Sequence, residues 1–302
     1  MQYNIYKFNY HNRGAIDSIP LFRTLGVLMK LQFTNGYYPD FSTISRILKF
    51  LSSQENKNKV LHKEIVSSLG IPYRQVRSVI SIMIGFGLVK TRGNIPTFLG
   101  EQVAQFDPYF QKHETLWLIH YIVSSNPNLF VWNRIITRVL QEHTEISLPF
   151  VIEEYFNDVK SSYSEQTYRE KLPREIRSVL DSYSDTELSH LNILKSQQSD
   201  HYFRITPIEI SDFAFLFSLI YFRDYFSPGA TAINIENISN DNNSPGRVFF
   251  LEDYQVRKKL NNLQNRNLIR VEQFGNLDQV RYPESSTQES ILAKIFGEEN
   301  AS

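Results

Sequence analysis

The most constraining feature of the sequence is a break between two short amphipathic segments in its first third. Apolar residues recur at helical spacing in His62–Leu69, and Gly70 stands where a glycine commonly ends a helix. Pro72 suits the first turn of the next helix, which an apolar stripe predicts over Tyr73–Phe86. The pattern therefore predicts a helix-turn-helix, in which two short helices are joined by a tight turn.

The residues after this helix pair predict a β-hairpin. Leu88–Lys90 can begin a strand, Gly93 and Asn94 can form a turn, and Pro96–Leu99 can return. Two helices followed by a hairpin is the element order of a winged helix. We therefore expect a winged helix-turn-helix at about residues 56–100.

A second winged-helix-like module is predicted near the C-terminal end. Val248–Leu251 predicts a short strand, and Asp253 is a suitable N-cap for a helix over Tyr254–Asn265. Leu268–Gln273 alternates as strands do, and Gln279–Tyr282 can return after a turn. A basic helix followed by a hairpin is the same order as in the first module.

These patterns divide the chain into an N-terminal region of residues 1–115, a helical middle of residues 116–228 and a C-terminal module with its tail at residues 229–302. No internal repeat is evident, and we expect polar loops at Ser196–Asp200 and Ser239–Ser244. The predicted fold class is mainly α, a helical protein with winged-helix modules near its N- and C-terminal ends. Apolar or amphipathic runs predict these middle helices: Thr115–Ser124, Phe130–Leu140, Pro173–Tyr183 and Ile210–Tyr225.

Composition and missing motifs exclude several classes of function. The 302 residues include no cysteine, which excludes disulfides, zinc ribbons and thiol nucleophiles. There is no signal-like or membrane-spanning apolar run, so we expect a cytoplasmic protein without a membrane partner. His113 and His120 lack a carboxylate at a metal-binding spacing, and we expect an ordinary partly buried pair. No phosphate loop, dinucleotide fingerprint or nucleophile elbow occurs, so we expect neither an enzyme nor a cofactor.

The net charge of the chain is zero, but the charges are unevenly distributed. Residues 142–200 contain twelve acidic and six basic residues, whereas cations gather in the two predicted modules. The first cluster holds one acid, Glu64, and seven basic residues: Lys57, Lys59, Lys63, Arg74, Arg77, Lys90 and Arg92. The second cluster, within residues 254–270, holds no acid and five basic residues: Arg257, Lys258, Lys259, Arg266 and Arg270.

The helix that precedes the hairpin in each module is the candidate DNA-binding element, because such helices present polar groups to bases and phosphates. In the first module the candidates are Tyr73, Arg74, Gln75, Arg77, Ser78, Lys90 and Arg92. In the second module Val256, Leu260 and Leu263 form the predicted buried stripe, with Lys259 beside the outward face. The candidates there are Arg257, Lys258, Asn261 and Asn262. The alternative for both modules is a packing unit with a solvated polar face, as in many proteins that never bind DNA.

Several segments of the chain also match a known pattern, in the right order. They are Ile71–Leu88 (IPYRQVRSVISIMIGFGL), Pro96–Gly100, Asp107–Tyr109, Glu114–His120, Ser125–Pro127 and Ser244–Asp253. In these segments the chain resembles a bacterial family of domains of unknown function, numbered four thousand and seven. The resemblance covers roughly residues 55–283 and does not extend to the first fifty-odd residues.

The resemblance implies a helical fold with winged-helix modules and supplies no established catalytic residues. Genes of the family tend to lie beside a sulfur-activating reductase-like enzyme, a cysteine desulfurase and large ATPases. Such loci install phosphorothioate sulfur in DNA or restrict phage. We therefore expect a non-catalytic, DNA-binding accessory subunit, with double-stranded DNA, an ATPase and a sulfur-transfer enzyme as partners. Two alternatives stay open: an adaptor that docks an ATPase or nuclease, and a transcriptional regulator of such a locus.

Overall fold

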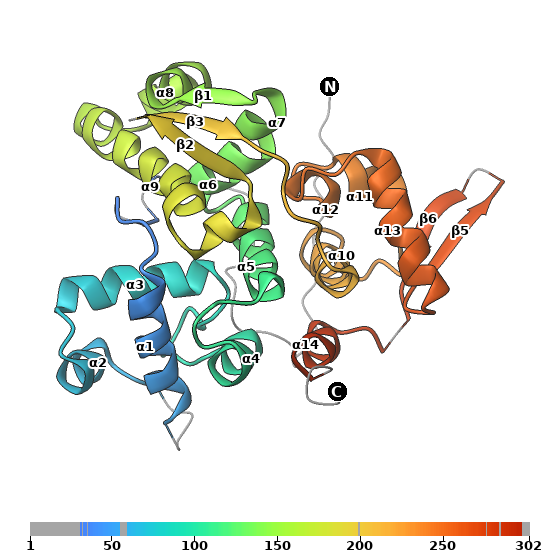
Figure 1. Cartoon of the computed structure of the whole chain (residues 1–302), viewed down its shortest axis with the longest axis horizontal. Helices are drawn as coiled ribbons and strands as arrows, with labels where there is room; N and C mark the ends of the chain where they lie inside the picture. The colour runs from blue at the N-terminus through green and yellow to red at the C-terminus, as the bar shows by residue number, and fades with distance from the viewer. Residues whose placement is uncertain are drawn as a thin grey trace.

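The computed structural model describes residues 31–297, apart from positions 32, 35, 55–58, 199, 276 and 284. Lys57 of the first basic cluster lies outside the described residues, as does the segment of residues 1–30. In the described part the chain is mainly helical and contains two small antiparallel sheets (Figure 1), which confirms the mainly α prediction.

The first part of the chain contains the predicted helix pair. Its helices are α1 (Phe41–Ser52), α2 (His62–Leu69), α3 (Tyr73–Gly85) and α4 (Phe98–Phe106). Gly70 ends α2 in the left-handed conformation, at a φ of 67°, which glycine adopts without steric cost. Val76, Val79 and Ile80 are buried, as the apolar stripe predicted.

The hairpin after α3 is shorter than the sequence predicted. Val89 and Pro96 form one isolated antiparallel bridge. Thr97 then begins α4, because its hydroxyl accepts a hydrogen bond from the Gly100 N–H. The return strand predicted as far as Leu99 is therefore wrong beyond the bridge.

The middle part contains a sheet that the sequence analysis did not predict. Its strands pair antiparallel in the order β1-β3-β2. The loop predicted at Ser196–Asp200 is wrong at its start, because Ser196 pairs with Tyr202 within the sheet. The prediction failed because Ser196 and its neighbours are polar and exposed, as loop residues usually are.

The elements of the middle part are α5 (His113–Ser125), α6 (Phe130–Arg134), the π-helical η1 (Ile135–Val139), α7 (Leu140–Glu142), β1 (Glu145–Ser147), α8 (Leu148–Phe156), the 3-10 helix η2 (Asn157–Ser162), the π-helical η3 (Thr167–Lys171), α9 (Leu172–Asp185), the 3-10 helix η4 (Glu187–Leu191), β2 (Leu194–Gln198) and β3 (His201–Arg204).

The C-terminal part departs from the prediction at its first strand. The segment Val248–Leu251 is not a strand, because Ser244 and Pro245 start a short helix that ends at Val248. The N-cap of the following basic helix is Glu252, and Asp253 is its first residue. The elements are α10 (Asp212–Phe226), β4 (Ala232–Asn234), α11 (Ile235–Asn240), α12 (Pro245–Val248), α13 (Asp253–Asn265), β5 (Arg270–Phe274), β6 (Leu277–Arg281) and α14 (Gln288–Gly297).

The middle and C-terminal parts share one connectivity. In each, a short strand is followed by helices and then by a hairpin, and the first strand pairs with the last one. The sheet orders β1-β3-β2 and β4-β6-β5 are therefore equivalent. This repeat was not evident in the sequence, because each strand is only three to five residues long.

Helix α5 lies near the centre of the molecule (Figure 1), and a buried hydrogen-bond network joins it to α9 of the middle part and α12 of the C-terminal part. His120 of α5 is fully buried and donates from Nε2 to the Val248 carbonyl of α12, at 2.9 Å. Because a carbonyl can only accept, Nδ1 of His120 accepts from the hydroxyl of Tyr183 on α9, at 2.7 Å. Trp132 of α6 donates to the same hydroxyl at 2.9 Å. The predicted partly buried histidine is thus a core residue with both ring nitrogens satisfied.

Burial of His120 makes the stability of the fold depend on pH. Desolvation lowers the pKa of the His120 imidazole from 6.5 to about 4, against the opposite effect of the Val248 hydrogen bond. Below pH 6.5 the unfolded chain binds a proton that the folded chain excludes, so acidification favours unfolding. We expect the free energy of unfolding to fall by about 2 kcal/mol between pH 7.5 and pH 5 through this group.

Urea unfolding of the wild type and of His120→Gln at both pH values tests this expectation. The glutamine amide can donate and accept without titrating, so the variant should lack this share of the pH dependence. Equal pH dependence of the two proteins would contradict the assigned role of His120.

Candidate nucleic-acid interface

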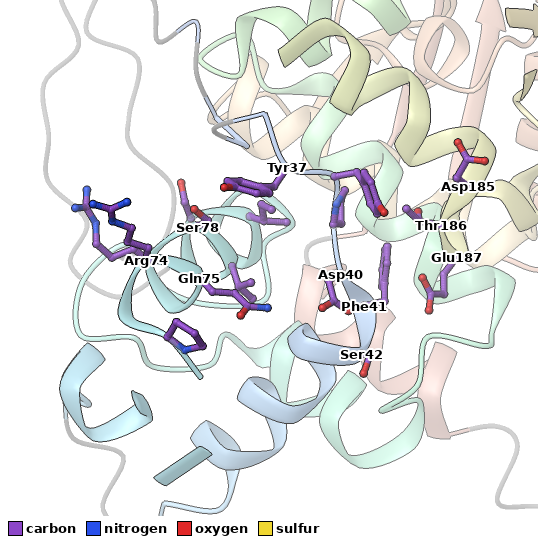
Figure 2. A pocket seen from close by; sticks show the side chains of 17 residues that line it. Tyr37, Asp40, Phe41, Ser42, Arg74, Gln75, Ser78, Asp185, Thr186 and Glu187 are labelled. Atoms are coloured by element: carbon purple, nitrogen blue, oxygen red, sulfur yellow. The ribbon is translucent and has the colours of Figure 1, made fainter. Parts of the chain in front are cut away.

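A groove with a volume of about 1100 Å³ opens beside the N-terminal half of α3 (Figure 2). Its walls are residues 37–42 around the start of α1, residues 72–82 of α3 and the turn before it, and residues 185–187 after α9. Figure 2 shows Arg74 at one end, Asp185 and Glu187 at the other, and Tyr37 and Gln75 between them. The groove therefore has a cationic end and an acidic end.

The cationic end is formed by the exposed side of α3. Arg74, Gln75 and Arg77 are exposed, and Ser78 is half-buried. Neither arginine forms an ion pair or hydrogen bond with another described residue. Because Val76 fixes the buried side of this turn, the two guanidinium groups are held at the surface, where their donors face no acceptor of the described residues.

The structure places the remaining predicted residues of the first module elsewhere. Tyr73 is half-exposed and packs edge-on against His62 of α2, outside the groove. Lys90 lines a smaller cavity of about 190 Å³ together with Tyr225 of α10. Arg92 is exposed in the hairpin turn and lines neither cavity. Four of the seven predicted residues thus share one groove.

Tyr37 and Tyr38 form one wall of the groove, the tyrosine wall. Its position depends on a buried carboxylate of α9. Glu175 accepts hydrogen bonds from the backbone N–H groups of Phe33 and Thr34 at 2.8 and 2.7 Å, and from that of Gly36 at 3.3 Å. Burial raises the pKa of this carboxyl, and the backbone hydrogen bonds act in the opposite direction. The three N–H groups thereby fix the chain just before Tyr37.

A glycine of α3 allows the same segment to pack closely. A Cβ at Gly85 would lie 2.1 Å from the ring of Phe33, a distance that no side chain can occupy. The backbone of α3 therefore contacts the aromatic ring directly. This contact and the Glu175 hydrogen bonds hold the segment before Tyr37 against α3 and α9.

The acidic end was not predicted from the sequence. Asp185 ends α9, and Thr186 caps η4 by accepting from the Leu188 N–H while its hydroxyl donates to the Ser182 carbonyl at 2.6 Å. Asp185 and Glu187 flank this buried threonine and line the groove. The sequence Ser184–Glu187 (SDTE) is common at helix ends. Nothing in it indicates that these residues lie across a groove from α3.

The basic helix α13 differs from its predicted form. Arg257 forms an ion pair with Asp278 of β6 at 2.6 Å and is only partly exposed. Lys259 is buried, where it contacts the Ile210 carbonyl at 2.6 Å and Asp212 at 3.3 Å. The prediction that Lys259 flanks the outward face is therefore wrong, because acids distant in the sequence fold onto the helix.

The other polar residues of α13 have varied surroundings. Arg266 lies 3.9 Å from Asp212 and above the ring of Phe213, at 4.3 Å from its centroid. Lys258 and Asn261 are exposed and Asn262 is half-buried. Lys258 forms no ion pair with a described residue, although its charge helps, after that of Lys259, to lower the pKa of Glu209. Most cations of the second basic cluster are thus paired with acidic residues of the chain itself.

The fold and the groove define a mainly helical protein with two equivalent three-stranded sheets and a groove of opposite charge at its two ends. The chain belongs to the family described as "Protein of unknown function (DUF4007)", whose model matches residues 46–296. The family resemblance seen in the sequence is therefore confirmed. None of the curated proteins matches the chain significantly.

Two solved structures have the same fold. The "Magnesium ion-bound SspB crystal structure" matches with a TM-score of 0.67 and 13% sequence identity, over 88% of this chain and 86% of that chain. The "SspB crystal structure" matches with the same TM-score and coverage and with 14% identity. At these identities the likeness extends to the fold alone.

In the residues that the structure describes, no group of three or more histidine, aspartate or glutamate side chains gathers as metal ligands do. Within the same residues, no helix is both long and apolar enough to span a bilayer.

The ion pair between Arg257 and Asp278 predicts unequal effects of two neighbouring substitutions. Arg257→Glu removes a pair whose side chains are 43% and 44% exposed and places two carboxylates together. We expect the free energy of unfolding to fall by about 1 kcal/mol. Lys258→Glu on the exposed side should change it by less than about 0.5 kcal/mol.

Urea unfolding at low salt measures both effects. Combining Arg257→Glu with Asp278→Arg should restore the stability, since the pair is re-formed with reversed charges. Equal losses for the two single variants would show that the ion pair does not hold the hairpin.

Proposed function

We propose that this protein is a non-catalytic, DNA-binding accessory subunit of a DNA-modification or phage-defence system. The observation that supports this most is the cationic end of the groove, where Arg74, Gln75 and Arg77 are exposed together on one turn of α3. Unused guanidinium donors on a rigid helix suit phosphate oxygens, and a glutamine amide can read a base edge. Its place of action would be the cytoplasm.

The arrangement around α3 supports its role as the recognition helix of a winged helix-turn-helix. Helices α1, α2 and α3 precede the bridge between Val89 and Pro96. The Val60 N–H donates to the Gly93 carbonyl at 2.8 Å, which ties the hairpin turn to the chain before α2. In both three-stranded sheets a first strand pairs in the same way with the hairpin that follows the helices. We propose the same module type for α11 to β6.

A second candidate function, protein docking, is favoured for the C-terminal module. Its basic helix is largely neutralised by ion pairs, and apolar side chains are exposed beside it. Tyr254 on α13 is 69% exposed, and Phe274 and Leu277 at the end of the hairpin are 62% and 42% exposed. Such a surface suits a protein partner, for which an ATPase or a sulfur-transfer enzyme of the same system is our proposal.

The proposed DNA contact predicts a specific loss of salt sensitivity. Replacing Arg74 and Arg77 with alanine should weaken binding to a double-stranded oligonucleotide and reduce the slope of log K against log salt by about 1.8. Thermal stability should stay within about 0.5 kcal/mol, because both side chains are exposed. Fluorescence anisotropy at several salt concentrations measures the slope.

The matched control is Lys195→Ala with Lys294→Ala. It removes the same charge from exposed positions on β2 and α14 that do not line the groove. The control should bind DNA as the wild type does. If both double variants lower the slope equally, binding depends on total charge and the assignment to α3 is wrong.

The non-catalytic part of the proposal has its own test. Supercoiled plasmid incubated with the protein should stay intact with and without added Mg²⁺, the ion named for one of the structural relatives. Gel electrophoresis measures the outcome. Nicked or linear plasmid in the Mg²⁺ sample would contradict the non-catalytic proposal.

A further inference from the structure

Beside the cationic end, the groove presents two exposed aromatic rings. Tyr37 is 67% exposed and Tyr38 is 54% exposed, and both line the groove immediately before α1. Large exposed rings on consecutive residues cost hydrophobic free energy unless they bind something. Their backbone is held by Glu175 through Gly36, so the rings are presented from a fixed segment.

The two ends of the groove suit different parts of a nucleotide, the phosphate at one end and the amino groups of the base at the other. Arg74 and Arg77 would attract a phosphate, whereas Asp185 and Glu187 would repel it. A carboxylate instead accepts hydrogen bonds from the amino groups on base edges, such as N4 of cytosine. Tyr37 lies between these ends in Figure 2, where a base could stack.

We propose that the groove takes an unpaired stretch of DNA, with its backbone at Arg74 and Arg77, its bases on Tyr37 and Tyr38, and their polar edges toward Asp185 and Glu187. In a paired duplex the base faces are stacked on neighbouring base pairs, so they cannot stack on the tyrosines. The volume of about 1100 Å³ exceeds that of a pocket for one small ligand, roughly 300–1,000 Å³, and accommodates more than one nucleotide.

This inference rests on the proposed DNA binding, and one experiment separates the two. Anisotropy compares a duplex with a central bulge of three unpaired cytosines and the same duplex fully paired. The wild type should bind the bulged DNA about tenfold more tightly, the effect of one base–aromatic stack. Tyr37→Ala with Tyr38→Ala should lose this preference and keep its affinity for the paired duplex.

Two variants serve as controls for the tyrosines. Tyr254→Ala removes an equally exposed ring from α13 and should keep the preference for the bulge. Tyr37→Phe with Tyr38→Phe should also keep it, because stacking needs only the ring. Melting temperatures verify that each variant is folded.

The acidic end is tested independently of the tyrosines, so the inference stays testable if the alanine variant fails to fold. The wild type should bind a bulge of three cytosines more tightly than one of three thymines, whose O4 would face a carboxylate. Asp185→Asn with Glu187→Gln should abolish this difference.

The possible results have distinct meanings. Equal wild-type affinity for bulged and paired DNA, or an unchanged preference in the tyrosine-to-alanine variant, would overturn this inference and leave the proposed function standing. No binding to either DNA would overturn both.

Discussion

The hydrogen bonds of His120 join the middle part of the chain to the C-terminal part. The imidazole is fully buried and must stay neutral, so its two nitrogens need one acceptor and one donor. The Val248 carbonyl and the Tyr183 hydroxyl supply them from α12 and α9. Tyr183 lies two residues before Asp185, so this contact also fixes the acidic end of the groove. Glu175, two turns earlier on α9, fixes the tyrosine wall.

The two basic helices show that a cluster of charges in the sequence has no single meaning. On α13, folding brings Asp212 and Asp278 against the cations, and a buried lysine is tolerated because acceptors surround it. On α3, no described acid pairs with Arg74 or Arg77. An unpaired cation at a groove is available to a ligand, whereas a paired one has its donors occupied. The contrast supports our proposals that the first module binds nucleic acid and that the second binds a protein partner.

Local signals in the sequence were sufficient to predict most of the helices. Gly70 and Pro72 set the boundary between α2 and α3, and the apolar stripes gave the buried faces of α3 and α13. The strands of the middle sheet were missed because Ser196 and its neighbours are polar and exposed, and only their pairing with β3 makes them a strand. The partners of Arg257 and Lys259 lie 21 and 47 residues away, and local patterns contain no information on such contacts.

The candidate site was predictable in one half only. Arg74, Gln75 and Arg77 share one helical turn, so their grouping follows from helix geometry. The groove needs two further walls from residues 37–42 and 185–187, which tertiary packing alone brings to α3. Exposed tyrosines before a helix and acids after one are common, and neither pattern indicates a site until the fold places them together.

The claim that α3 contacts DNA is tested most directly by site-specific photo-crosslinking. A photoreactive amino acid in place of exposed Gln75 would be compared with one in place of exposed Asn261 on α13, each with the same labelled duplex. We expect the position on α3 to crosslink to DNA and the position on α13 to give little or no DNA adduct. DNA adducts from Asn261 alone, or from neither position under conditions where the protein binds DNA, would contradict the account.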